Sequence, residues 1–323
     1  MEKRLHNHIS ESILTLYSSA IYCFITWIAA GLFTHHLWLQ MALMAATCYL
    51  MVEMSKHLIF LRLRSWMVTS ALMMLSSCCA FNYHSTSAGI IGICAVTTIF
   101  LLLSTYQNPQ DVGHTFFAYV VLGIASLFFV KALYFIPLMW LLTLQMLQSL
   151  SFHTWLASIL GTITPYWLIG SWLIYNQEFN VLTANFEPLF NWQAPTEDQL
   201  LTPIRVVIFL IIAILFVLGA INFWSKSYEE RIRTRQYYGF LQWMVLALGI
   251  FVLLQPQYYD MLIRVIIICA CPFAAHFFTL NNSKITNYLF FITLAFMIIL
   301  SVISVNESLT EIVNLKLLEI WNG

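Results

Sequence analysis

The sequence predicts an all-α, polytopic transmembrane helical bundle of about eleven crossings, within a range of about 10–12. Hydrophobic residues make up 61% of the 323 residues and charged residues only 9%, against roughly 45–50% and 25% in soluble domains. Long stretches, such as Ser65 to Gln110 and Ala132 to Gln177, contain no Asp, Glu, Lys or Arg. A transmembrane β-barrel would instead alternate apolar and polar residues over segments of about ten residues, and this chain does not.

Segments with the length and apolar character of a membrane-spanning helix follow one another along the whole chain. They lie at 12–33, 36–54, 66–83, 86–105, 113–130, 132–148, 153–176, 204–224, 238–254, 259–279 and 284–303. We divide the stretch 114–147 in two because about 34 residues in one helix would be about 51 Å long, too long for a single crossing. A tight hairpin near Lys131 and Pro137 is the simpler interpretation, and a re-entrant pair is the alternative.

The domain prediction is one transmembrane unit over 1–305 with a long loop at 177–203, followed by a C-terminal segment at 306–323. The first apolar run, about 22 residues after the polar start, is too long for the core of a signal peptide and predicts a retained anchor. The segment 306–323 interleaves apolar and charged residues at helical spacing, which predicts an amphipathic helix on the membrane surface. A helix packed against the end of the bundle is the alternative.

The distribution of Lys and Arg predicts a cytoplasmic N-terminus, because basic residues are retained on that side. With this orientation the cytoplasmic loops hold ten of the 14 basic residues: Lys3, Arg4, Lys56, Arg62, Arg64, Lys226, Arg231, Arg233, Arg235 and Lys284. The loop 177–203 then lies outside and contains acidic residues but no Lys or Arg. The formal net charge is zero, so nothing indicates a nucleic-acid partner.

Three charged residues near the outer ends of two crossings are the candidate ligand-binding residues. Asp260 and Arg264 are four residues apart, so on a helix they share one face and can pair. Arg205 opens the crossing at 204–224 on the same side, and with Arg264 it could hold a phosphate or carboxylate, for which the planar guanidinium is well suited. The alternatives are an ion pair at the membrane interface and, for Arg205, a side chain that reaches the headgroups.

The loop 177–203 combines aromatic rings with carboxylates, as a sugar-binding site does. The rings belong to Phe179, Phe186, Phe190 and Trp192, and the candidate catalytic bases are Glu187, Glu197 and Asp198. Aromatic residues are also common at membrane interfaces, which is the alternative interpretation.

The sequence predicts neither a metal site nor a cofactor. The histidines are scattered, with no two on one helix face at a spacing of four, and all seven cysteines fall in apolar segments, where they predict packing residues. There is no phosphate-binding glycine loop. The basic run from Lys226 to Tyr238 could bind anionic lipid headgroups or a cytoplasmic partner, or simply fix the topology.

The stretches 117–141 and 152–167, with Gly123-Ile-Ala-Ser-Leu, a proline-containing helix and Gly161-Thr-Ile-Thr-Pro-Tyr, resemble a family of uncharacterised polytopic inner-membrane proteins of Bacteroidota. The run Arg231-Ile-Arg-Thr-Arg-Gln-Tyr-Tyr is also similar to theirs. This resemblance implies a multi-pass protein of the bacterial inner membrane and supplies no activity.

More distantly, Gly123 to Lys131 and the order of helices resemble the GT-C glycosyltransferases, which use polyprenyl-linked sugars. Those enzymes place a catalytic Asp or Glu in the first outer loop, where this chain has Thr34-His35-His36. The catalytic residue of that family therefore has no counterpart at this position, and a transferase would need a carboxylate from the loop 177–203.

We therefore expect an accessory, non-catalytic component of envelope biogenesis, working with lipid-linked glycan or surface-protein machinery. Its expected partners are membrane lipids, including a polyprenyl-phosphate lipid, or an envelope protein complex. The alternatives are a GT-C-like glycosyltransferase that uses a polyprenyl-linked sugar, and a transporter. A transporter would need polar groups near mid-membrane beside broken helices, for which Pro165 and Pro272 are the candidate breaks.

Overall fold

The computed structural model describes residues 5–62, 65–190 and 202–306, and the regular structure in these ranges is entirely helical. The α-helices are α1 (Leu5–Glu11), α2 (Ile13–Ala29), α3 (Trp38–Leu58), α4 (Met67–Cys78), α5 (Thr86–Ser104), α6 (Val112–Phe128), α7 (Ile136–Leu142), α8 (Phe152–Tyr175), α9 (Phe179–Phe190), α10 (Pro203–Ser225), α11 (Ile232–Leu254), α12 (Tyr259–Leu280) and α13 (Lys284–Val305). Short 3₁₀ or π turns lie at η1 (Ala80–His84), η2 (Val130–Phe135), η3 (Thr143–Leu147), η5 (Ser227–Glu229) and η6 (Pro256–Tyr258). The prediction of an all-α bundle is confirmed.

Each of the eleven predicted segments falls on a helix, but their lengths differ. Within the described residues, seven helices are long and apolar enough to cross a membrane, or eight if α1 and α2, which meet at 80°, form one broken span. Helices α4 and α6 are apolar but shorter. The chain is therefore a multi-pass membrane protein, while the number eleven stays a prediction. The predicted amphipathic helix at 306–323 lies outside the described residues, apart from Asn306.

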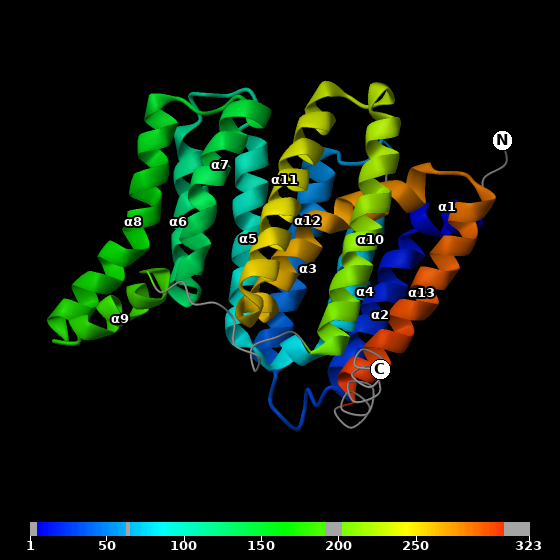
Figure 1. The fold of residues 1–323 in the computed structure, drawn as a ribbon, viewed down its shortest axis with the longest axis horizontal. Coiled ribbons are helices and arrows are strands. Elements are labelled where there is room, and N and C mark those ends of the chain that lie inside the picture. Colours follow the sequence, from blue (N-terminus) through cyan, green and yellow to red (C-terminus); the bar gives the residue numbers. More distant parts are fainter. Residues whose placement is uncertain (1–4, 63–64, 191–201, 307–323) are drawn as a thin grey trace.

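The stretch 114–147 divides as the sequence predicts. Helix α6 ends at Phe128, and the chain then turns through η2 into α7, where Pro137 occupies the first turn. Proline is accepted there because the first N–H groups of a helix have no partner within the helix. Figure 1 shows α6 and α7 side by side as a hairpin.

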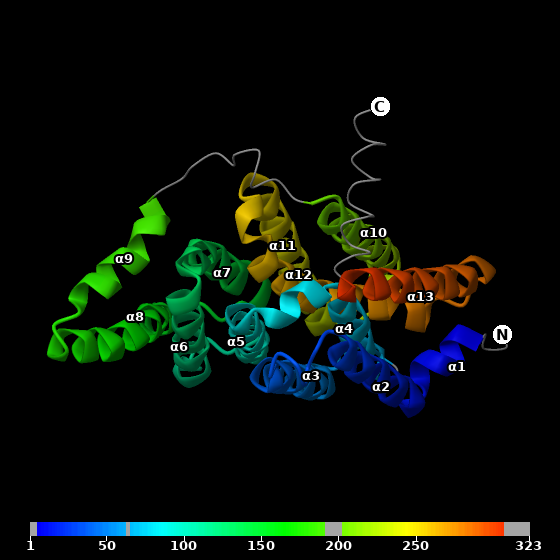
Figure 2. The same cartoon turned by 90° about the horizontal axis from the view of Figure 1, so that it is seen from below.

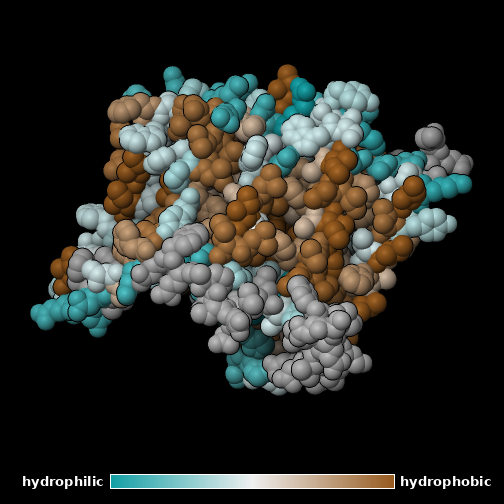
Figure 3. All heavy atoms as spheres, in the orientation of Figure 1, coloured by the Kyte–Doolittle hydropathy of each residue, from teal (hydrophilic) through white to brown (hydrophobic). Residues whose placement is uncertain are grey.

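The helices stand side by side between two ends, which we name for the termini (Figure 1). The N-terminal end carries α1 and the connections 105–111, 148–151 and 226–231. The C-terminal end carries the connections 30–37 and 79–85, helix α9, and the last turn of α13. Seen along the bundle, α12 lies between α10 and α11 on one side and α4 and α5 on the other (Figure 2). The surface is apolar in a band between the more hydrophilic ends (Figure 3), as a bilayer requires.

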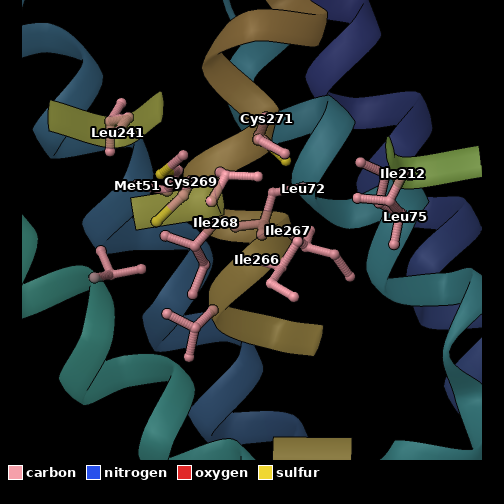
Figure 4. Close-up of a cluster of buried hydrophobic side chains, with 14 of the residues drawn as sticks. Met51, Leu72, Leu75, Ile212, Leu241, Ile266, Ile267, Ile268, Cys269 and Cys271 are labelled. Atoms are coloured by element: carbon pink, nitrogen blue, oxygen red, sulfur yellow. The ribbon is translucent and has the colours of Figure 1, made fainter. Parts of the chain in front are cut away.

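Helix α12 is the centre of the bundle. Of its candidate span, 94% is buried inside the protein, whereas only 33% of the α10 span and 22% of the α13 span is buried. Its apolar side chains meet those of its neighbours in one cluster (Figure 4). The members drawn and labelled there are Met51, Leu72, Leu75, Ile212, Leu241, Ile266, Ile267, Ile268, Cys269 and Cys271. All seven cysteines are buried and free, in agreement with the packing role that the sequence predicts.

Small residues allow two helix pairs to approach closely. A Cβ atom on Gly161 of α8 would lie 2.5 Å from the Phe116 carbonyl oxygen of α6, and one on Gly123 would lie 2.8 Å from the Thr162 carbonyl oxygen. On α10, a Cβ on Gly219 would lie 2.6 Å from the Phe273 carbonyl oxygen of α12. Small residues at helix crossings favour association in membranes because they permit extended backbone contact.

We predict that Gly161→Ala destabilises the protein by about 1–3 kcal/mol, since the added methyl group forces α6 and α8 apart. The measurement is the midpoint of thermal unfolding of the purified protein in detergent. Gly113→Ala is the matched control, because a Cβ on Gly113 meets nothing within 4 Å. Equal midpoints for the two variants would show that the α6–α8 contact is not a tight one.

The distribution of basic residues also predicts on which side each end lies. Thr183→Cys, on the exposed surface of α9, is expected to react with a membrane-impermeant thiol reagent in intact cells. Gln110→Cys, exposed in the connection at the N-terminal end, is expected to react only after the membrane is permeabilised. Native cysteines do not compete because all are buried. The reverse pattern of labelling would invert the orientation.

Candidate functional site

Polar and charged side chains gather at both ends of α12. We call the group Asn82, Arg205, Asp260 and Arg264, at the C-terminal end of the bundle, the arginine cluster. We call the group Arg62, Glu230 and His276, at the N-terminal end, the histidine cluster. Charged groups inside a membrane bundle are expensive, so each cluster is a candidate site.

The arginine cluster brings together all three ligand-binding candidates of the sequence, with a different pairing. The Arg205 Nη2 atom lies 2.9 Å from the Asp260 Oδ2 atom, so the ion pair of Asp260 is with Arg205 and not with Arg264. The Tyr259 hydroxyl donates to the Arg205 carbonyl oxygen at 3.0 Å, and the guanidinium lies 5.1 Å from the centre of the Phe81 ring. Arg205 is therefore held in place and does not simply extend to the headgroups.

Arg264 turns away from Asp260 because α5 leaves space for its side chain and a neighbouring turn supplies a hydrogen-bond acceptor. Its Nη2 atom donates to the Asn82 carbonyl oxygen at 2.8 Å. Its side chain passes two glycines of α5: Cβ atoms there would lie 3.8 Å from Nη1 at Gly89 and 3.7 Å from Cδ at Gly92. The expected pairing of Asp260 with Arg264 is thus wrong, since spacing on a helix does not reveal what the adjacent helices offer.

Arg264 has no ion-pair partner in the described part of the chain. Its one hydrogen bond there is the bond to Asn82, and the side chain is only partly exposed. With Arg205 matched by Asp260, the arginine cluster carries one positive charge in excess and several unused N–H donors. This arrangement suits an anion.

The histidine cluster was missed by the sequence reasoning. The Arg62 Nε atom lies 2.7 Å from Glu230 Oε1, and the same oxygen lies 3.4 Å from Nε2 of His276. The side chains of Glu230 and His276 are almost completely buried, and Nδ1 of His276 has no hydrogen-bond partner among the described residues. One histidine in an apolar run, His276, was the available signal, but spacing along the chain does not indicate that Glu230 reaches it.

Aromatic rings from α10 and α11 also pack against the imidazole of His276, so that the buried ring is surrounded by side chains. The Phe223 ring of α10 lies 4.9 Å away and the Tyr238 ring of α11 lies 5.7 Å away, both edge-on. Phe223 and Tyr238 stack on each other at 4.0 Å. The histidine cluster therefore joins the α10–α11 connection to α12 and, through Arg62, to the connection after α3.

At the surface of this cluster, Arg62 also donates to Glu229, with Nη2 and Oε2 2.8 Å apart. This hydrogen bond lowers the pKa of Glu229 and raises the pKa of Arg62. Because the carboxyl pKa is lower in the folded state, the pair favours folding at neutral pH and loses this effect as pH falls through the lowered pKa.

The candidate bases of the long loop do not form a site in the described residues. Glu187 is exposed on α9 and makes no hydrogen bond or ion pair with the described chain, while Glu197 and Asp198 lie outside it. Phe186 packs against Tyr166 of α8, with ring centres 5.0 Å apart. In the described ranges, no three His, Cys, Asp or Glu side chains gather as metal ligands would.

Comparison of the chain with protein-family models, curated proteins and solved structures finds no match.

We predict that Arg62→Met lowers the stability of the detergent-purified protein by about 1–3 kcal/mol, because it leaves the buried Glu230 carboxylate without its strongest donor. The double variant Arg62→Met/Glu230→Met is expected to recover part of the loss, since it removes the stranded charge as well. Glu229→Met is the control, because this partner is exposed. A double variant less stable than Arg62→Met would contradict the assigned role of Glu230.

Proposed function

We propose that this membrane protein binds a lipid phosphate at the arginine cluster and acts, without catalysing a reaction itself, in bacterial envelope biogenesis. The observation that carries the proposal is the Arg264 guanidinium, which has no ion-pair partner in the described chain. Burying a guanidinium within a bundle costs desolvation free energy, and a bound anion that pairs with it is the simplest way to offset this cost.

The position of Arg264 narrows the chemistry of the anion. It lies five residues after the start of α12, about 7 Å along the helix axis, and therefore just below the C-terminal end of the bundle. A phosphate tied to a hydrocarbon chain can reach this depth from the bilayer, with its oxygens at the guanidinium and its chain in hydrocarbon. Polyprenyl phosphates, the carriers of envelope glycans, have this chemistry.

A binding role is favoured over a GT-C-like transferase because the arginine cluster has no free carboxylate among the described residues to act as general base. Asp260 is its one carboxylate in the described chain, and Arg205 engages it. The first loop at this end offers Thr34, His35 and His36 in place of an acid. A transferase would need a base from Glu187, Glu197 or Asp198, and Glu187 has no described contact with the cluster.

A binding role is also favoured over transport. Between Arg264 and His276, α12 carries only apolar residues, which include Ile266, Ile267 and Ile268 of the packed core (Figure 4). Helix α12 is continuous through Pro272, as α8 is through Pro165. A transport pathway along α12 would need polar groups at this depth.

We predict that Arg264→Gln weakens the binding of a long-chain polyprenyl monophosphate at least tenfold, the scale of a lost charge-assisted hydrogen bond. Binding is measured on the purified protein in lipid nanodiscs, with the uncharged polyprenol as the ligand control. Lys56→Gln, an exposed lysine at the opposite end, is the protein control. Unchanged affinity in Arg264→Gln would refute phosphate binding here.

The same variant tests the cellular role. In the cells that make the protein, Arg264→Gln is expected to reproduce the change in surface glycans or surface proteins that follows removal of the chain. A normal cell surface after removal would contradict a role in envelope biogenesis, and would leave the binding measurement unaffected.

A further inference from the structure

A groove of about 430 Å³ lies between α2 and α3 on the flank of the bundle. Helix α2 packs mainly against α4, and α3 packs mainly against α5, so the two helices diverge and Met73 of α4 contributes to the groove between them. Its volume is within the range of about 300–1,000 Å³ that is typical of ligand sites. The groove therefore has room for a ligand chain, and its apolar lining exposes no charged group.

The walls of the groove reach the residues next to Arg264. Met44 of α3 lines the groove, and the residue before it, Leu43, lies with Arg264 against Gly89 of α5. A Cβ atom on Gly89 would be 3.0 Å from Leu43 Cδ1 and 3.8 Å from Arg264 Nη1. The groove is therefore an apolar surface beside a guanidinium that lacks an ion-pair partner in the described chain.

A stacked pair of rings marks the end of the groove nearest the C-terminal end of the bundle. Trp27 lines the groove and stacks on Tyr83, with ring centres 3.9 Å apart and planes 5° apart. The Tyr83 hydroxyl in turn lies 3.1 Å from the Thr26 hydroxyl. Tyr83 belongs to η1, as does Asn82, which accepts the hydrogen bond of Arg264. The same turn thus adjoins both the apolar groove and the arginine cluster.

We propose that a hydrocarbon chain of the phosphate-bearing lipid lies in the groove between α2 and α3, with its phosphate at Arg264. This inference rests on the proposed function and adds the part of the same site that holds the hydrocarbon chain. Lipid hydrocarbon fills an apolar groove in a bilayer better than water does, because the groove offers water no hydrogen bonds. Binding therefore depends on the length of the chain as well as on its charge.

The test narrows the groove and compares two ligands. Ala45 is exposed and lines the groove, whereas Ala42, one turn earlier on α3, is exposed but does not line it. Ala45→Trp is expected to weaken the binding of a long-chain polyprenyl monophosphate about tenfold, the equivalent of roughly two buried methylene groups. It is expected to leave the binding of geranyl monophosphate, whose chain is short, within about twofold. Ala42→Trp is the matched control and should change neither.

A second modification avoids any effect on folding. Ala45→Cys can be converted to its hexyl disulfide on the folded protein with hexyl methanethiosulfonate, since every native cysteine is buried. The modified protein should lose affinity for the long-chain ligand as the tryptophan variant does, and Ala42→Cys treated in the same way should not.

Each outcome separates the two proposals. If both groove modifications leave long-chain binding unchanged while Arg264→Gln abolishes it, the groove is wrong and the phosphate site stands. If Arg264→Gln also has no effect, the proposed function itself fails. If the groove modifications change only the oligomeric state of the protein, the groove is a contact between copies of the chain and not a lipid site.

Discussion

The constraint on which the structure depends is the cost of placing polar groups on a helix that is enclosed by other helices. Helix α12 carries Arg264 near one end and His276 near the other, and neither end leaves such a side chain wholly in water. Its neighbours are arranged accordingly. Two glycines on α5 leave space for Arg264, a carbonyl in η1 accepts its hydrogen bond, and Glu230 enters the bundle from the α10–α11 connection to meet His276.

The positions of the helices could be predicted well from the sequence, because a helix that crosses the hydrocarbon core needs an apolar run of a minimum length, and such runs are easily recognised. All eleven predicted segments are helical, including the two on either side of Phe129. What apolar character could not predict is which helix lies at the centre. Helix α10 is more apolar than α12 but much less buried, because a lipid tail accepts a leucine as readily as a protein interior does. Small and polar residues, such as the cysteines, Pro272 and His276 of α12, are better indicators.

The sites were predicted only in part, for a related reason. The sequence selected Arg205, Asp260 and Arg264, and the structure does place them together, but it pairs Asp260 with Arg205, 55 residues away. The contact between Glu230 and His276 spans 46 residues and joins a connection to a helix. Spacing within one helix identifies residues that share a face. It contains no information on the partners that other helices supply, and these decide which charge is matched and which is not.

The distance between the two clusters limits what they can do together. Arg264 and His276 are twelve residues apart, about 18 Å along α12, and the packed apolar core lies between them. Along α12, no chain of polar groups connects the two side chains, so a proton or ion has no route along this helix from one to the other.

The two clusters also differ in whether their charged groups have partners. Glu230 already has Arg62 and His276 as partners, whereas the one partner of Arg264 in the described ranges is a carbonyl group. The histidine cluster therefore acts as a structural junction that fixes the α10–α11 connection, and the site that we propose for a ligand lies at the other end, beside the groove between α2 and α3.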